Sequence, residues 1–208
     1  MSKAKVAVID YGMGNLWSVV NALHYLGYTA FISSQPKEIK RADFIILPGV
    51  GSFKSAILSL KSLGLDDVIL EAAKIKNKKI LGICLGLQLL GLRSFENGNE
   101  EGLGLIPAEV GRFSAINDEI KIPHIGFNAV VKQSEMKLFS GLPQTADFYF
   151  VHSYRMLIDQ LCLSRVATAN YGVEFVAAYE HENIFATQFH PEKSQSNGLM
   201  VLNNFLTK

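Results

Sequence analysis

In the first half of the chain, short apolar runs alternate with longer segments of helical periodicity, and this alternation constrains the fold more than any other feature. The apolar runs have the length of buried strands and occupy residues 5–10, 29–33, 42–49 and 80–84. The segments with helical spacing occupy residues 15–27, 52–64 and 66–79. Strands that alternate with helices build a mostly parallel sheet with helices on both faces. The sequence therefore predicts an α/β fold.

In the second half the pattern changes from alternating strands and helices to short strands. From about Glu109 the chain offers short strands joined by turns, in the stretches AEVGRF, NAVV, FYFVHSY, FVAAYE and IFATQF, and it closes with one amphipathic helical segment, GLMVLNNFL. We expect these strands to be antiparallel and to extend the same sheet. Because no linker, repeat or low-complexity segment interrupts the chain, we expect residues 1–208 to form a single domain.

Charge and hydropathy exclude several functions. The chain has 20 basic and 19 acidic residues, so its net charge gives no general attraction to nucleic acid or to an anionic membrane. The apolar run at the start is broken at Asp10, too early for a signal peptide or a membrane span. We therefore expect a cytoplasmic protein that binds a small polar ligand or a protein partner, with both of its cysteines as free thiols.

The segment LGICLGLQLL places Cys84 between Gly82 and Gly86, directly after an apolar run and directly before another. Glycines two residues to either side permit a sharp turn from strand to helix, which exposes a nucleophile at the edge of a sheet. A position at the start of a helix also favours the thiolate. The alternative is a buried structural cysteine, since a free cysteine packs like a small hydrophobic residue.

A nucleophilic thiol needs a base, and TQFHPEKS supplies the best candidates. His190 and Glu192 are two residues apart, so on an extended chain their side chains share a face, and Pro191 favours that extended form. Glu192 would then orient the imidazole while His190 takes the thiol proton. His24 and His181 are interpreted as surface or packing residues, and Cys162 as structural.

Acyl transfer also needs donors for a developing oxyanion. The glycine-rich turn LPGVGSF follows a predicted strand, so the backbone N–H groups of Val50 and Gly51, with that of Leu85 after the nucleophile, are candidates. GMGNLW and GVGSFK begin like a dinucleotide-binding loop but lack its third glycine, which makes nucleotide binding a weak alternative. No metal-ligand spacing occurs, and we expect no cofactor.

Together these motifs resemble the class I, or triad, glutamine amidotransferases, which have a flavodoxin-like fold. The resemblance is strongest to the glutaminase subunits of imidazole glycerol phosphate synthase and runs almost end to end, through AVIDYGMGNLWSV, LPGVGSF, LGICLGLQLL, EGLGLIPAEV, PHIGFN, YFVHSY and TQFHPEKSQSNGLMVLNNF.

The resemblance implies that the protein hydrolyses L-glutamine to glutamate and ammonia. Cys84 would form a glutamyl thioester, His190 would protonate the departing ammonia and activate water, and Glu192 would hold His190. The resemblance also places five residues around the substrate glutamine: Gly49, Gln88, Glu96, Ser153 and Tyr154.

The resemblance further implies a barrel-shaped cyclase subunit that uses the ammonia in histidine biosynthesis. Asn15, His124 and Phe127 resemble the surface that faces this partner. PHIGFN stands where the histidine enzymes usually have Pro-His-Met-Gly-Trp-Asn, so a paralogue that supplies ammonia for amidino sugars of surface polysaccharides remains an alternative. The residues alone also leave open a different cysteine hydrolase and an inert binding subunit.

Overall fold

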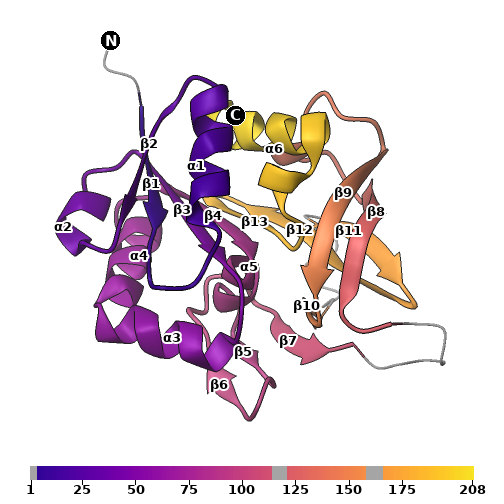
Figure 1. Ribbon diagram of the computed structural model, residues 1–208, viewed down its shortest axis with the longest axis horizontal. Coiled ribbons are helices and arrows are strands. Elements are labelled where there is room, and N and C mark those ends of the chain that lie inside the picture. Colours follow the sequence, from indigo (N-terminus) through magenta and orange to yellow (C-terminus); the bar gives the residue numbers. More distant parts are fainter. Residues whose placement is uncertain (1–3, 114–120, 158–165) are drawn as a thin grey trace.

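The computed structural model describes residues 4–113, 121–157 and 166–208 (Figure 1). Within these ranges the chain builds one nine-stranded sheet of order β2-β1-β3-β4-β13-β12-β11-β8-β9 and a small sheet of order β10-β7-β5-β6. The α/β prediction is confirmed. Cys162 falls outside the described residues.

The first half forms the parallel part of the large sheet. Its strands are β1 (Lys5–Ile9), β2 (Thr29–Ser33), β3 (Phe44–Gly49) and β4 (Lys79–Cys84). Its helices are α1 (Leu16–Tyr25), α2 (Pro36–Ile39), α3 (Phe53–Ser62), α4 (Leu65–Lys74) and α5 (Leu85–Leu89). Helix α1 begins after the predicted cap Asn15, and the chain leaves it through Gly27, which has the positive φ of 85° that ends helices.

The two faces of the sheet carry separate cores. Along β1, Val6 and Val8 pack on one face with α1 and the C-terminal helix α6 (Gln195–Thr207), whereas Ala7 and Ile9 pack on the other face with α3 and α4. Figure 1 shows α1 and α6 together on one side and α2, α3 and α4 on the other. This alternation follows from the two-residue period of a strand buried on both faces.

The second half extends the same sheet. Its strands are β8 (His124–Lys132), β9 (Thr145–His152), β11 (Val166–Tyr171), β12 (Val173–His181) and β13 (Ile184–Thr187). Neighbouring strands in this part are antiparallel, as predicted, with one exception. β13 pairs antiparallel with β12 but parallel with β4, so its carboxyl end lies at the same edge as that of β4.

The sequence did not predict the small sheet. It consists of β5 (Arg93–Ser94), β6 (Glu100–Glu101), β7 (Glu109–Arg112) and β10 (Tyr154–Met156). The predicted strand FYFVHSY is divided at Ser153, where the chain leaves β9 and enters β10. Tyr154 is thereby placed in a different sheet from His152. Among the described residues, no helix has both the length and the apolar character that a membrane span requires.

Candidate active site

Cys84 lies at a sharp turn between a strand and a helix. It is the last residue of β4 and the residue before α5, with φ 55° and ψ −105°. A residue other than glycine at such a positive φ costs about 1–3 kcal/mol and persists where the surrounding structure imposes it. The turn leaves the side chain 5% exposed, at the carboxyl edge of the sheet.

The flanking glycines permit this turn because no side chain would fit at either position. A Cβ at Gly86 would overlap the carbonyl oxygen of Leu47 in β3, and a Cβ at Gly82 would lie 2.8 Å from backbone atoms of Gly86 and Leu87. Helix α5 therefore packs with its backbone directly on the strands. Because α5 has only five residues, its dipole contributes less to the thiolate than the sequence suggested, and side chains close to the sulfur matter more.

Two neighbouring strands bring the other candidate groups to Cys84. In β3, Gly49 is the register partner of Cys84, so Val50 and Gly51 follow directly beside the sulfur. In β13, Thr187 is the register partner of Ile83, so the segment with His190 follows on the opposite side. The site thus lies at the carboxyl ends of three adjacent parallel strands, where ligands bind in open α/β sheets.

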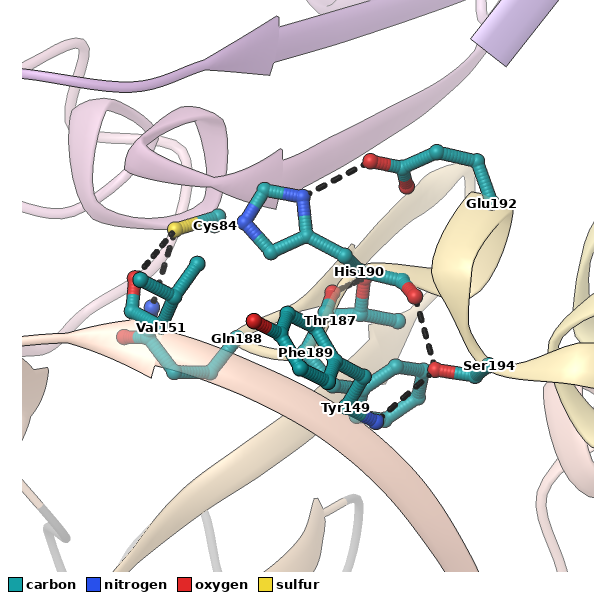
Figure 2. A network of polar contacts seen from close by, with 9 residues as sticks. All are labelled: Cys84, Tyr149, Val151, Thr187, Gln188, Phe189, His190, Glu192 and Ser194. Carbon is teal, nitrogen blue, oxygen red and sulfur yellow. Dashed lines mark hydrogen bonds and ion pairs between the residues drawn. The ribbon is translucent and has the colours of Figure 1, made fainter. Parts of the chain in front are cut away.

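His190 and Glu192 form a buried pair. Nδ1 of His190 lies 2.8 Å from Oε1 of Glu192, and the side chains are 3% and 2% exposed (Figure 2). Glu192 lies in a single 3₁₀ turn, Pro191–Lys193, rather than on the extended chain that the sequence suggested. Figure 2 shows Nε2 of His190 directed toward Cys84, and this nitrogen has no hydrogen-bond partner among the described residues.

The backbone of His190 is fixed by strand β9. Its N–H donates to the carbonyl of Tyr149 at 2.9 Å, and its carbonyl accepts a 2.7 Å hydrogen bond from the hydroxyl of Ser194. The same hydroxyl accepts from the N–H of Tyr149 at 2.9 Å (Figure 2). The imidazole is therefore held by the sheet as well as by Glu192.

The charges around His190 favour its protonated form. Burial lowers the pKa of the imidazole, but the neighbouring Cys84 sulfur and the Glu192 carboxylate outweigh burial and raise that pKa to about 10. At neutral pH, His190 is therefore an imidazolium between two groups that can carry negative charge. This arrangement suits a thiolate nucleophile and its proton carrier.

A pocket of about 320 Å³ opens beside the sulfur. Its lining includes eight of the residues that the sequence singled out: Val50, Gly51, Cys84, Leu85, Gln88, Glu96, Ser153 and Tyr154. It also includes Pro123, Val151 and His152, which lie in the motifs PHIGFN and YFVHSY but were not predicted as site residues. Gly49 lies beneath the pocket, against the buried ring of Tyr11. Within the described residues, no cluster of His, Cys, Asp or Glu could hold a metal ion.

Two polar side chains of the pocket are fixed by backbone groups. Glu96 accepts a 2.7 Å hydrogen bond from the N–H of Phe53, the first residue of α3. Gln88 donates from Nε2 to the carbonyl of Tyr154 at 3.0 Å. Both side chains present oxygen acceptors to the pocket, and the Glu96 carboxylate matches the ammonium group of a free amino acid.

His124 is not on the surface, in contrast to what the resemblance implied. It is 3% exposed because its ring stacks on Tyr171 and Phe150, and its Nδ1 lies 3.1 Å from Nε2 of His152. His152 in turn places Nδ1 2.7 Å from the carbonyl of Tyr154. Burial lowers the pKa of both rings, so both are neutral near pH 7. Since a carbonyl only accepts, the single proton of His152 is on Nδ1, and His124 donates to Nε2 of His152.

We predict that this histidine pair makes the fold sensitive to acid. Burial lowers the pKa of His124 to about 4 and that of His152 to about 3. The unfolded chain takes up these protons near pH 6.5 and the folded chain does not, so the free energy of unfolding should fall as the pH drops from about 6.5 toward 4. The fall should be about 1.4 kcal/mol per pH unit for each histidine.

Denaturant unfolding at pH 7 and pH 5 measures this effect. His152→Gln should weaken the pH dependence, whereas His24→Asn, at an exposed position of α1, should leave it as in the wild type. Equal free energies of unfolding at the two pH values would show that the pair is not held neutral by the fold.

The comparison with known proteins defines the family. The model of the glutamine amidotransferase class-I family matches residues 7–208. The chain belongs to this family of amide-hydrolysing enzymes, as its fold and the motifs around Cys84 indicate.

Curated relatives are similar over almost the whole chain. Imidazole glycerol phosphate synthase subunit HisH 1 of Campylobacter jejuni (strain RM1221) is 46% identical over 201 residues, which is 97% of this chain and 98% of the relative. Subunit HisH of Moorella thermoacetica is 47% identical over 200 residues, 96% of this chain and 93% of the relative. Subunit HisH 2 of Pseudomonas aeruginosa is 45% identical over 204 residues, which is 97% of this chain and 98% of the relative.

Solved structures share the fold at lower identity. A putative GMP synthase subunit from Thermoplasma acidophilum has a TM-score of 0.75 at 22% identity and covers 99% of this chain and 94% of its own. PurLQS from Thermotoga maritima has a TM-score of 0.72 at 20% identity, and the match covers 99% of this chain and 98% of the PurLQS chain. At these identities the likeness concerns the fold alone.

Proposed function

We propose that this protein is the glutaminase subunit of an imidazole glycerol phosphate synthase, formed by a single glutamine amidotransferase domain over residues 1–208. The observation that carries the proposal is the position of Cys84, on a strained turn between a buried His190–Glu192 pair and a pocket of about 320 Å³. The near full-length similarity to HisH subunits supports the choice of pathway.

In the proposed reaction, Sγ of Cys84 attacks the side-chain amide carbon of glutamine. The S–C bond forms, the C–N bond breaks, and His190 gives its proton to the nitrogen, which leaves as ammonia. Water then loses a proton to His190 and attacks the thioester; the C–S bond breaks, glutamate is released, and the Cys84 thiolate beside the His190 imidazolium is restored. Both steps place negative charge on the former amide oxygen, and the N–H groups of Val50, Gly51 and Leu85 would stabilise it.

The remaining pocket residues would select the amino acid. Gln88, Glu96, Ser153 and Tyr154 line the pocket together with Cys84. In this role the Glu96 carboxylate pairs with the substrate ammonium. Gly49 lets the strand that precedes the oxyanion donors pass close to Tyr11, since a Cβ there would overlap the phenol oxygen.

Ammonia released into water would be protonated and lost, so the proposal includes a barrel-shaped cyclase partner. Phe127 and Ile125 on β8 are 53% and 60% exposed, and Asn15 is exposed at the start of α1. These apolar and amide groups are proposed to contact the cyclase. His124 lies beneath β8 and would support this surface without touching the partner.

Replacing Glu192 by Gln should slow the reaction strongly. The carboxylate is the only group that holds Nδ1 of His190 at hydrogen-bond distance among the described residues, and it stabilises the imidazolium. We expect kcat to fall by about a thousand- to ten-thousand-fold with a small change in KM, as for the equivalent change in a Ser-His-Asp triad. The kcat and KM of steady-state glutamate release, with the ligand-loaded cyclase present, measure this effect.

Glu182→Gln is the matched control for this variant, because Glu182 is an exposed glutamate of the turn between β12 and β13, at the other end of β13 from His190. It should leave kcat as in the wild type. If Glu192→Gln retained more than about a tenth of the wild-type kcat, Glu192 would not be the orienting group.

The pathway is tested by pairing the protein with the histidine-pathway cyclase of its own organism. Glutamate release is measured for the protein alone, with the cyclase, and with the cyclase carrying its ribonucleotide ligand. Strong stimulation by the loaded cyclase, lost in Cys84→Ala, is the expected result. Cysteine-dependent activity that this cyclase does not change would contradict the histidine assignment, and the amidino-sugar partner would then be tested.

A further inference from the structure

Gln188 is a buried polar residue next to the reacting sulfur for which the reaction above has no role. It follows β13 directly, its side chain is fully buried, and its backbone N–H donates to the carbonyl of Ala177 at 2.8 Å. Its Nε2 lies 3.7 Å from Sγ of Cys84 (Figure 2). A buried amide is costly unless its groups are paired, so its contacts define what it can do.

The contacts of Gln88 determine which end of the Gln188 amide faces the sulfur. The carbonyl of Tyr154 can only accept, so the group of Gln88 that lies 3.0 Å from it is the NH₂. The second hydrogen of this NH₂ needs an acceptor, and Oε1 of Gln188 lies 3.1 Å away. With Oε1 so placed, the NH₂ of Gln188 is the end directed at Cys84.

The other neighbour of the sulfur makes this donor necessary. The carbonyl oxygen of Val151 lies 3.8 Å from Sγ and can accept a hydrogen bond from the neutral thiol (Figure 2). Once the thiol has lost its proton, the same carbonyl repels the sulfur. Gln188 then offers the N–H donor that a thiolate requires, and His190 offers the opposite charge on the other side.

We propose that Gln188 is a further catalytic residue, whose side-chain NH₂ donates a hydrogen bond to the Cys84 thiolate and whose orientation is set by the amide of Gln88 and the carbonyl of Tyr154. The donor stabilises the thiolate and holds Sγ at the mouth of the pocket until it attacks. Gln88 has then used both of its hydrogens inside the protein, which leaves its Oε1 for the substrate.

This inference rests on the proposed function only in naming Cys84 as the nucleophile, and its test needs neither glutamine nor a partner. The rate of alkylation of Cys84 by iodoacetamide is measured against pH, with the site of modification identified by peptide mass spectrometry. Gln188→Glu keeps an oxygen that can accept from Gln88 but loses the donor. We expect its alkylation at pH 7 to be about tenfold slower than that of the wild type, with the profile displaced to higher pH.

Gln188→Met is the second variant, because it removes the donor without adding charge and should change the profile in the same direction by less. Gln133→Glu is the matched control: its amide donates to Thr168, outside the pocket, and the variant should alkylate like the wild type. Profiles of both Gln188 variants that coincide with the wild type would overturn the proposal.

A second measurement keeps Gln188 in place and therefore does not depend on how the Gln188 variants fold. The side-chain amide signal of Gln188 is followed by NMR over the pH range in which alkylation rises. We expect it to shift with the same midpoint as the alkylation rate and to stay constant in Cys84→Ala. A Gln188 signal that does not respond to the ionisation of Cys84 would also overturn the proposal.

Discussion

Replacing Cys84 by Ala should abolish glutamate release while the protein stays folded. The substitution removes the thiol that lies between His190 and the pocket, and the His190–Glu192 pair then has no nucleophile to assist. The loss of a triad nucleophile costs about a million-fold in kcat in a well-studied serine protease, so activity should fall below detection. Glutamate release by the partner-activated protein measures the effect.

The same substitution at the other cysteine, Cys162→Ala, is the control and should retain the wild-type rate. Thermal unfolding of both variants verifies that they fold. Because Cys84 sits at a positive φ of 55°, which alanine tolerates no better than cysteine, Cys84→Ala should unfold at nearly the wild-type temperature. Glutamate release that persists in Cys84→Ala would place the nucleophile elsewhere.

The substitution with the largest expected effect on stability is Gly86→Ala. A Cβ at this position would overlap the carbonyl oxygen of Leu47, a backbone atom in the middle of the sheet that cannot move aside. Helix α5 would have to move away from β3, and the turn at Cys84 would move with it. We expect the free energy of unfolding to fall by about 3 kcal/mol or more and activity to be lost.

Gly104→Ala separates this steric effect from the general cost of replacing a glycine. Gly104 has a φ of 65° and open space where a Cβ would lie, so its variant should lose only about 1 kcal/mol, from the strained backbone. Denaturant unfolding of both variants measures the difference. If Gly86→Ala were as stable as Gly104→Ala, α5 would not be packed on β3 as described.

The parallel half of the fold could be predicted from the sequence because its inner strands are buried on both faces. Runs such as ILGIC stand out as apolar blocks between helical segments, and the structure places β4 at Lys79–Cys84, beginning one residue earlier than predicted. The turn at Cys84 could be predicted for a similar reason, since the glycines that permit it lie within two residues of it. Local geometry thus followed from local sequence.

The second half was harder because its pairing depends on distant parts of the chain. Strand β11, Val166–Tyr171, was missed, since its residues alternate too weakly to separate a strand from a loop. β13 was expected among the antiparallel strands, yet it lies beside β4, some hundred residues earlier, and no local pattern encodes that neighbour. The parallel pairing is nevertheless what brings His190 to Cys84.

The same difference between local signals and long-range contacts applies to the site residues. Motif residues of the pocket were found, but the role of Gln188 was missed although it lies two residues before His190, because its importance arises from contacts with Gln88 and Cys84 on other elements. His124 was expected on the partner-facing surface because the family resemblance places the segment PHIGFN there, yet it is buried whereas Phe127 is exposed. Residues one or three apart on a strand face opposite sides, and this signal was available in the sequence.

The measurement that tests the account most directly is the mass of the protein during turnover. The partner-activated protein is mixed with glutamine and quenched in acid within milliseconds to seconds. It is then digested, and the masses of its peptides are measured by mass spectrometry. We predict a transient addition of one glutamyl group on the peptide that contains Cys84, absent in Cys84→Ala and persisting longer in Glu192→Gln. Rapid glutamate release with no adduct on Cys84 at any time, or with an adduct on another residue, would contradict the assignment of Cys84 as the nucleophile.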